Sequence, residues 1–385
     1  MYKIRPSIME YTMTGDNNNY IFMSPVSDGI YRWNAQKSEG VDCFADGEDK
    51  YDMQLYSYSI KYRGCIFFSP WRAEMCIRYE VNSGEVKSIS IEHGKVDEYY
   101  EMSIYNDQLY LIGLYTRNVY CYDDNLQFFK KIYYSDYSGE KISCRKRCRE
   151  FSKKVYWEKN NIHIFDFIEL EWKKYNSVKE DIKEALLVGE ECYVVDAKND
   201  FWVWSINDNS WSAVSLPRKA DIVHLQDCGD VVNIYFGKGS EYLIFNKNNR
   251  DVICCENDFL NDEFNYLYSE IDRDTMLISA YKKSKRLFIG QDDDYYIYKM
   301  GDRLLKLPPL IEGEREQSLF IDGFMSRQWR NCVDRNSFMY EVIGLGINEI
   351  LGWLSTSRRD EQETREKCVG YEIYNAIKLS GNHCE

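Results

Sequence analysis

The sequence predicts an all-β protein, namely a seven-bladed β-propeller with four antiparallel strands in each blade. Three observations predict this fold. Short aromatic and β-branched runs are bounded by Asn, Asp and Gly, aromatic residues make up 16% of the chain, and the runs repeat along it. The chain has 385 residues, a length at which an all-β ring still folds as one unit. The clearest copy spans residues 191–217, where three strand-like runs alternate with two polar turns.

Two middle strands of this copy have equivalents along most of the chain. The first is marked by Ile21, Phe67, Tyr110, Tyr156, Tyr193, Tyr235 and Phe288. The second is marked by Trp33, Tyr79, Tyr122, Phe165, Trp204, Phe245 and Tyr298. Successive second markers lie 46, 43, 43, 39, 41 and 53 residues apart, a period typical of propeller blades. Because one such sheet cannot bury both of its faces alone, stacked blades would share a ring-shaped core.

The first blade is expected to begin with its inner strand. From the inner to the outer edge, its expected strands are residues 7–14, 20–23, 29–33 and 41–44. Those of the second blade are residues 55–61, 65–68, 76–81 and 86–91, and Gly84 supplies the positive φ of the last turn. The long spacing before the seventh copy indicates an insertion at residues 251–275. Six or eight blades result if one copy is degenerate or a terminal strand completes another.

The repeat stops after Pro308 and Pro309. Residues 337–355 have apolar side chains near helical spacing, and a second helix is expected to start near Ser357. We therefore expect a propeller over residues 1–310 and a C-terminal segment over residues 311–385 that forms an α-helical appendage. Such an appendage would either pack against the propeller or serve as a docking handle for a partner.

Residues 201–217 resemble a kelch repeat. An aromatic strand, the polar turn Asn207-Asp208-Asn209, Trp211 and the closing Pro217 follow the kelch order. The resemblance covers roughly residues 7–308 as architecture and implies a kelch-like β-propeller. The chain departs from the kelch pattern after the second strand, where Asp196 and Ala197 stand in place of a glycine pair. As the most regular copy, this one is expected to use its tryptophans for packing between blades.

Composition limits the classes of partner and the compartment. The formal net charge is −14, which repels phosphate backbones and argues against nucleic acid as a partner. No run approaches the roughly 18 apolar residues of a membrane span, and no secretory signal pattern opens the sequence. The 13 cysteines are an odd number, and several fall in strand-like runs, which is typical of reduced, buried thiols. The expected compartment is the cytoplasm.

Signatures of catalysis, cofactors and metals are weak. Gly237-Lys238-Gly239-Ser240 lacks the spacing of a phosphate-binding loop, and no Gly-x-Ser-x-Gly elbow occurs. Cys144 and Cys148 have the spacing of half a zinc site without a second half. The sequence therefore predicts no cofactor and no metal site. His163 is expected to be a hydrogen-bonded core residue. His224, beside Asp221 in a predicted inner strand, is either a structural residue or an acid or base at the central channel.

Candidate binding residues lie in the loops that a propeller gathers on one face, namely the loops between middle strands and between blades. The sequence places there Trp71, Arg72, Glu74, Tyr115, Arg117, Lys198, Asp200, Asp292, Asp293 and Asp294, with His224 at the channel. Exposed Trp and Arg are typical of interfaces and sugar sites, and Trp71 is the best single candidate. The basic run at residues 141–154 is either a local anion site or a solvated inner strand and loop of the fourth blade.

Two functions fit these observations. The first is a non-catalytic scaffold that holds a protein or peptide partner through one loop face, with the C-terminal helices as a second contact. The alternative is a carbohydrate-binding or carbohydrate-active propeller, a hydrolase or lyase with a glycan site at the channel mouth. The fold by itself assigns neither function.

Overall fold

A computed structural model describes residues 14–16, 19–23, 30–33, 38–41, 56–70, 73, 75–90, 100–123, 125–134, 140–144, 151–176, 181–257, 260–261, 263–272, 275–281, 294–299 and 304–306. Over these residues the chain forms seven antiparallel sheets, in which neighbouring strands also follow one another in the sequence. Six of the sheets described have four strands and one has three. Within the same residues, no helix is long and apolar enough to cross a membrane.

The first four sheets are built from fifteen strands. Blade 1 has β1 (Thr14–Asp16), β2 (Asn19–Met23), β3 (Ile30–Trp33) and β4 (Ser38–Val41). Blade 2 has β5 (Tyr56–Tyr62), β6 (Cys65–Pro70), β7 (Met75–Glu80) and β8 (Val86–Ser90). Blade 3 has β9 (Tyr100–Tyr105), β10 (Gln108–Gly113), β11 (Val119–Tyr122) and β12 (Phe128–Ile132). Blade 4 has β13 (Lys153–Glu158), β14 (Asn161–Asp166) and β15 (Glu171–Asn176).

The remaining three sheets complete the set. Blade 5 has β16 (Ile182–Val188), β17 (Glu191–Asp196), β18 (Phe201–Ser205) and β19 (Ser210–Val214). Blade 6 has β20 (Ile222–Asp227), β21 (Val231–Phe236), β22 (Glu241–Asn246) and β23 (Val252–Glu256). Blade 7 has β24 (Asn265–Asp272), β25 (Thr275–Tyr281), β26 (Asp294–Lys299) and β27 (Leu304–Lys306).

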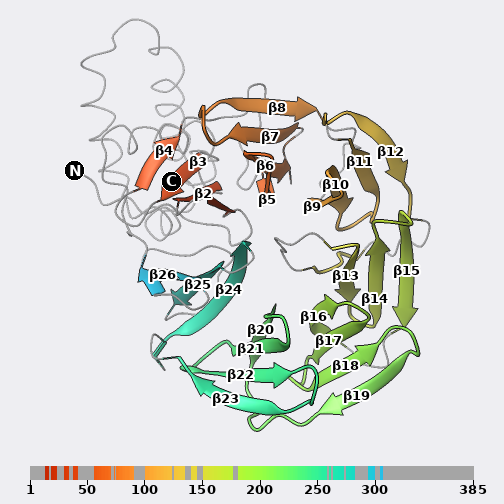
Figure 1. Cartoon of the computed structure of the whole chain (residues 1–385), viewed down its shortest axis with the longest axis vertical. Coiled ribbons are helices and arrows are strands. Elements are labelled where there is room, and N and C mark those ends of the chain that lie inside the picture. The colour runs from red at the N-terminus through yellow and green to blue at the C-terminus, as the bar shows by residue number, and fades with distance from the viewer. Residues whose placement is uncertain are drawn as a thin grey trace, which may run out of the picture.

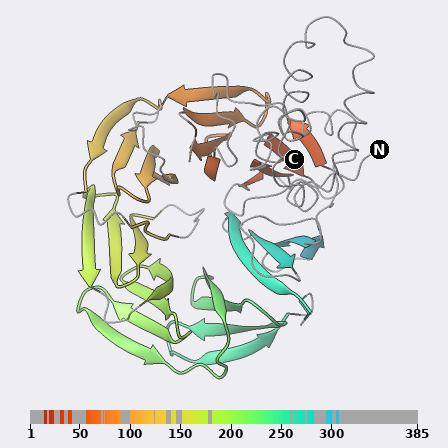
Figure 2. The same cartoon turned by 180° about the vertical axis from the view of Figure 1, so that it is seen from behind.

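The sheets stand around a central space like the blades of a propeller (Figure 1 and, from behind, Figure 2). In every blade except blade 4 the first strand is the innermost, and inner strands of neighbouring blades contact one another, for example β5 with β9 and β16 with β20. Contact between β1 and β24 brings the first and last blades together. We call the side with the second-to-third-strand loops and the connections between blades the loop face. The predicted seven-bladed, all-β propeller is confirmed.

The hydrophobic core is divided into clusters that lie between neighbouring blades. Trp204 and Val194 of blade 5, for example, share a cluster with Val155 and Ile164 of blade 4. Five further clusters join blades 1 and 2, 2 and 3, 3 and 4, 5 and 6, and 6 and 7 in the described part of the chain. Blades 2 to 6 thus bury both faces against their neighbours. Trp202, Trp204 and Trp211 all belong to the cluster between blades 4 and 5, as predicted.

In blade 4 the innermost position is held by a short bridging segment and not by one of its three strands. Ser143 forms a β-bridge with Trp157 of β13, and the backbone groups of the two residues exchange hydrogen bonds of 2.7 and 2.9 Å. The segment 141–144 therefore occupies the inner edge, and β13 takes the second position. The sequence run around this segment was predicted to feed the inner edge of the fourth blade, and the bridge agrees with that interpretation.

Several strand boundaries match the prediction and others need correction. The four strands of blade 2 lie within two residues of the predicted bounds, and Gly84 has the expected positive φ of 74°. In blade 1 the outer strand is β4 at Ser38–Val41, not residues 41–44. Residues 251–275 are not an insertion, because they contain β23 and β24. The second strand of blade 7 is β25, whereas the predicted marker Phe288 lies outside the described residues.

Candidate functional site

Part of the predicted loop-face site lies outside the described residues. This applies to Trp71, Arg72, Glu74, Asp292 and Asp293. Asp294 is the first residue of β26, but its side chain is not among those described. The predicted C-terminal helices, with the proposed boundary at residue 310, also lie outside this part. The roles assigned to all of these residues stay predictions.

Arg117 lies on the loop face as predicted, but its side chain is buried rather than exposed. It follows half-buried Tyr115 in the loop between β10 and β11, and its backbone has a positive φ of 58°. Its side chain is 1% exposed, and its Nη2 lies 2.5 Å from Oε2 of Glu158, at the end of β13. The indole of Trp172 donates to the Arg117 carbonyl oxygen at 2.9 Å. Arg117 therefore fastens this loop of blade 3 to blade 4.

Glu158 extends the same contact into the core through His163, which is fully buried as predicted. The Nε2 of His163 lies 3.1 Å from Glu158 Oε1, and its Nδ1 lies 3.1 Å from the Tyr134 hydroxyl. Since a carboxylate only accepts, the contact assigns the proton to Nε2 and leaves Nδ1 to accept from Tyr134. Burial lowers the pKa of His163, and nearby Arg117 adds to this effect. Burial alone would raise the pKa of Glu158, but His163 and Arg117 hold it below its usual value.

Both shifts predict loss of stability in acid. A folded-state pKa below that of the unfolded chain means that the unfolded state binds more protons. The His163 contribution is therefore complete above its ordinary pKa of 6.5 and is lost as the pH falls toward the folded value. The Glu158 contribution is lost in the same direction below 4.5. We expect the melting temperature to fall between pH 7 and pH 5, and His163→Gln to flatten that fall. An unchanged pH profile in the variant would assign the effect to other groups.

Lys198 and Asp200 lie together in the turn between β17 and β18 on the loop face. Lys198 is exposed, and a carboxylate oxygen of Asp200 lies 2.8 Å from the amine of Lys219 in the connection to blade 6. Lys183, at the start of blade 5, donates to Asn199 Oδ1 at 3.0 Å and forms an ion pair with Asp221. The turn and the connection thus form a surface of alternating charge, and most of its charged groups already have partners.

His224 packs between blades 6 and 7 and is only 5% exposed. β20 has a bulge between Ile222 and His224, and the His224 ring contacts blade 7. There its ring stacks on Tyr268, with centroids 5.9 Å apart, and lies equally far from Tyr235. Asp221, the predicted neighbour in an acid or base pair, is exposed and pairs with Lys183. Of the two interpretations given for His224, this packing favours the structural one.

The basic run ends in a buried ion pair rather than in solvent. Lys154 is 7% exposed, pairs with Glu101 of β9, which is 1% exposed, and donates to Ser103 at 3.2 Å. The Tyr156 hydroxyl donates to the other Glu101 oxygen at 2.9 Å. Nearby, burial raises the pKa of the Cys144 thiol to about 12, so this sulfur stays protonated at neutral pH. These groups tie blade 3 to blade 4, while residues 145–150 of the run lie outside the described part.

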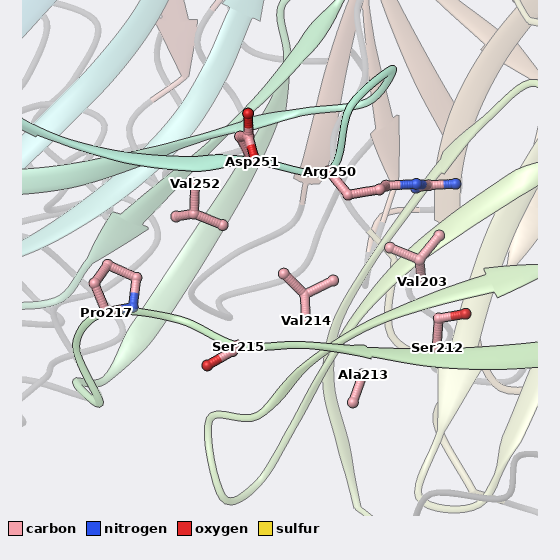
Figure 3. Close-up of a pocket in the computed structure, with 9 residues that line it drawn as sticks. All are labelled: Val203, Ser212, Ala213, Val214, Ser215, Pro217, Arg250, Asp251 and Val252. Carbon is pink, nitrogen blue, oxygen red and sulfur yellow. The ribbon is translucent and has the colours of Figure 1, made fainter.

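An open groove between the outer parts of blades 5 and 6 was not predicted. We call it the rim groove; it has a volume of about 500 Å³ and is lined by Val203, Ser212, Ala213, Val214, Ser215, Pro217, Arg250, Asp251 and Val252. In Figure 3, Val203, Val214 and Val252 point into the space between the strands, whereas Ala213 points away from it. All three valines belong to or pack on the core cluster between blades 5 and 6. The floor of the groove is therefore the half-covered edge of that core.

Arg250 marks one end of the rim groove and Pro217 the other (Figure 3). Arg250 forms an ion pair with Glu191 of β17 and lies over the Phe245 ring, with its Cζ 5.8 Å from the centroid. Burial alone would raise the pKa of Glu191, but hydrogen bonds from Arg250 and Tyr193 lower it. About half of the Arg250 side chain is exposed, 45% by area. Its guanidinium is thus held in place by Glu191 while close to half of its side chain remains exposed.

The groove could not be found by pattern, since its three valines sit at ordinary strand positions 11 and 38 residues apart. Each would be read as a core residue of its own blade. Whether such side chains are covered depends on how closely the neighbouring sheet packs over them. Pro217 closes the repeat in the sequence, but no neighbouring residue in the sequence indicates that it lies near Val252 of β23.

Comparisons with known proteins identify the fold of this chain but not its family. No protein-family model matches the chain, and no curated protein matches it. The solved structure of YCF48 bound to D1 peptide is similar with a TM-score of 0.57 and 10% identity, covering 78% of this chain and 94% of that chain. A catalytically inactive virginiamycin B lyase from Staphylococcus aureus, with quinupristin, has a TM-score of 0.50 and 9% identity over 72% and 92% of the two chains. The chain has the β-propeller fold.

PorZ of Porphyromonas gingivalis, a component of the type-IX secretion system, is similar over 80% of the present chain. That match has a TM-score of 0.51 and 11% identity and covers 39% of the PorZ chain. At such identities the likeness concerns the arrangement of blades, and activities do not follow from it.

Proposed function

We propose that this propeller is a non-catalytic scaffold that binds an extended, apolar segment of a partner protein in the rim groove. The observation that carries the proposal is the half-covered valine floor between blades 5 and 6. Its volume of about 500 Å³ lies within the range of about 300–1,000 Å³ typical of ligand pockets. Apolar surface left open beside polar groups marks interaction sites, because covering it removes that surface from water.

The chemistry of the groove indicates how such a segment would bind. β19 is the last strand of its sheet in the described residues, and its residues 212–214 line the groove. An extended segment along that edge would form main-chain hydrogen bonds, and alternate side chains would meet Val203, Val214 and Val252. Arg250 would donate to a carbonyl or carboxylate at one end of the segment.

Two further points support a binding scaffold. YCF48, a propeller of similar fold, has been solved with a peptide bound. The kelch-like order of residues 201–217 falls on β18 and β19, which form one wall of the groove. We therefore propose that this chain is kelch-like in its blade construction and acts in the cytoplasm. Trp71 and the other predicted loop-face residues would provide a second contact for the same partner.

The carbohydrate alternative is less well supported by the described inner strands. It needs an acid and a base that face a substrate at the channel mouth. Glu101 of β9 is instead buried beside Lys154, and His224 of β20 is packed on Tyr268. These two titratable groups take part in packing between blades.

Random peptides displayed on phage and selected on the full chain test the proposal. We expect extended, apolar peptides, and we expect them to protect the backbone amides of residues 210–216 and 250–253 from hydrogen exchange. Val214→Glu should weaken their binding by at least about tenfold, because it places a charge on the apolar floor. Ala213→Glu is the matched control, since its side chain points away from the groove (Figure 3).

Equal peptide binding by the Val214 and Ala213 variants would rule out the rim groove. Protection confined to other residues would do the same. A melting temperature measured for each variant separates loss of the site from loss of the fold, and Val252→Ser offers a milder change on the opposite wall.

A further inference from the structure

The outer strand of blade 3 carries the most unusual surface in the described part of the chain. Of the five large hydrophobic side chains that are exposed among the described residues, three lie within or next to this strand, β12, namely Phe128, Phe129 and Tyr133. Their exposed fractions are 37%, 45% and 74%. A bulge between Cys121 and Tyr122 of β11 leaves Phe129 without a partner in the pairing register. Exposed aromatic side chains gathered on one edge strand are typical of interaction surfaces.

Two lysines stand among these aromatic side chains. Lys130 and Lys131 form no ion pair with any described residue, although the whole chain has a net charge of −14. The Lys131 amine lies 4.7 Å from the ring centroids of both Tyr120 and Tyr133, which holds it by cation–π attraction. Its neighbour Lys130 pairs across the strands with Cys121, so the two amines lie on opposite faces of the sheet.

Lysines on two other outer strands, in contrast, have carboxylate partners. Lys87 of β8 pairs with Glu85 at 3.0 Å, and Lys173 of β15 pairs with Glu171 at 2.9 Å. Their lysines are thus neutralised within the same hairpin or strand. On β12, by contrast, positive charge and aromatic surface occur together on an edge that no described strand covers. Figure 1 shows β12 on the outer perimeter of the ring.

We propose that β12 is a second docking site, which adds an acidic extended segment of a partner protein as a fifth strand to blade 3. Main-chain hydrogen bonds to the free edge would provide affinity, and side chains would provide selectivity. Because Lys130 and Lys131 point to opposite faces, the segment needs two carboxylates at adjacent positions, one for each amine. Apolar residues beside them would cover Phe128 and Phe129.

Charge excludes a second copy of the chain as the occupant of this edge. Antiparallel pairing of β12 with itself would bring Lys130 and Lys131 of one copy against the same residues of the other, and like charges opposite one another destabilise a sheet. An anionic membrane is disfavoured as well. Two lysines attract such a surface only weakly, whereas the net charge of −14 repels it.

The test uses the full chain and a fluorescent ten-residue peptide of alternating Thr and Val with two adjacent Glu at its centre. We expect this peptide to bind and to protect the backbone amides of residues 128–132 from hydrogen exchange. Lys130→Glu combined with Lys131→Glu should weaken binding at least about tenfold and reverse the preference toward a peptide with Lys in place of Glu. Lys173→Glu on β15 is the matched control and should leave binding unchanged.

Three outcomes would overturn the proposal. The first is failure of the acidic peptide to bind the natural chain. The second is binding that the double substitution leaves unchanged, or that persists when Pro is placed at the centre of the peptide, where it removes a donor of the strand. The third is binding to phosphatidylserine vesicles that depends on Lys130 and Lys131 while the peptide does not bind. Val214→Glu should bind the acidic peptide normally, so this site and the rim groove can fail separately.

Discussion

Replacing Lys154 by methionine is expected to lower the free energy of unfolding by about 3–5 kcal/mol, the cost of removing one member of a buried ion pair. Glu101 is 1% exposed and lies between blades 3 and 4. After the change it keeps hydroxyl donors from Ser103 and Tyr156 but loses the cation that balances its charge. Urea unfolding of the full chain, followed by tryptophan fluorescence, measures the effect.

Two controls separate the buried charge from a general effect of removing lysine. Lys153→Met removes the neighbouring amine, which pairs at 3.0 Å with Glu190 in a largely exposed contact, and should cost about 0–1 kcal/mol. The double change Glu101→Leu with Lys154→Met should recover most of the loss, because no charge is left in the interface. A Lys154 variant as stable as the natural chain would show that solvent reaches this site.

Trp204→Ala is expected to destabilise the propeller by about 3–5 kcal/mol, the range for removal of a large buried aromatic side chain. The Trp204 side chain is fully buried between blades 4 and 5. Its ring lies 5.6 Å from that of Trp211 and 4.9 Å from that of Tyr175, and its indole donates to Asn209 at 2.9 Å. The substitution opens a cavity across the blade interface, which calorimetry should record as a lower melting temperature.

Trp202→Ala is the matched control for this prediction. Trp202 lies two residues away on the same strand and the same side of the sheet, but it is only half-buried. Its loss should cost about half as much, since hydrophobic stabilisation scales with the apolar area removed from water. Equal losses would show that this interface packs alike around Trp202 and around Trp204.

Much of the fold could be predicted because its signals are local. A strand with two buried faces needs β-branched or aromatic side chains over four to six positions, and turns need Asn, Asp or Gly. Blade 2 shows both, and its strands were placed within two residues. Blade 7 shows why the rest failed: the run around Phe288 and the run of β25 are equally strand-like, and only pairing with β24 and β26 selects β25.

The candidate sites were harder to predict because exposure depends on segments far away in the sequence. Arg117 was predicted to be an exposed interface residue, yet it is buried against Glu158, 41 residues later. Lys154 belongs to the basic run predicted to be an anion site or a solvated strand and loop, yet it is buried against Glu101, 53 residues earlier. The β12 surface had a local signal in the adjacent pairs Phe128-Phe129 and Lys130-Lys131, which interrupt the alternation of a half-buried strand.

The sequence alone was enough to predict the class of fold and to favour seven blades, because alternating strands and a repeat near 43 residues leave a ring of sheets as the arrangement that buries them. It also determined that Trp204 is a packing residue. The tertiary structure shows which charged groups are buried, where the core remains open at the rim groove, and that the edge of β12 is not covered by a described strand. These properties depend on how neighbouring blades meet, and a contact between blades joins residues about one repeat apart that no local pattern links.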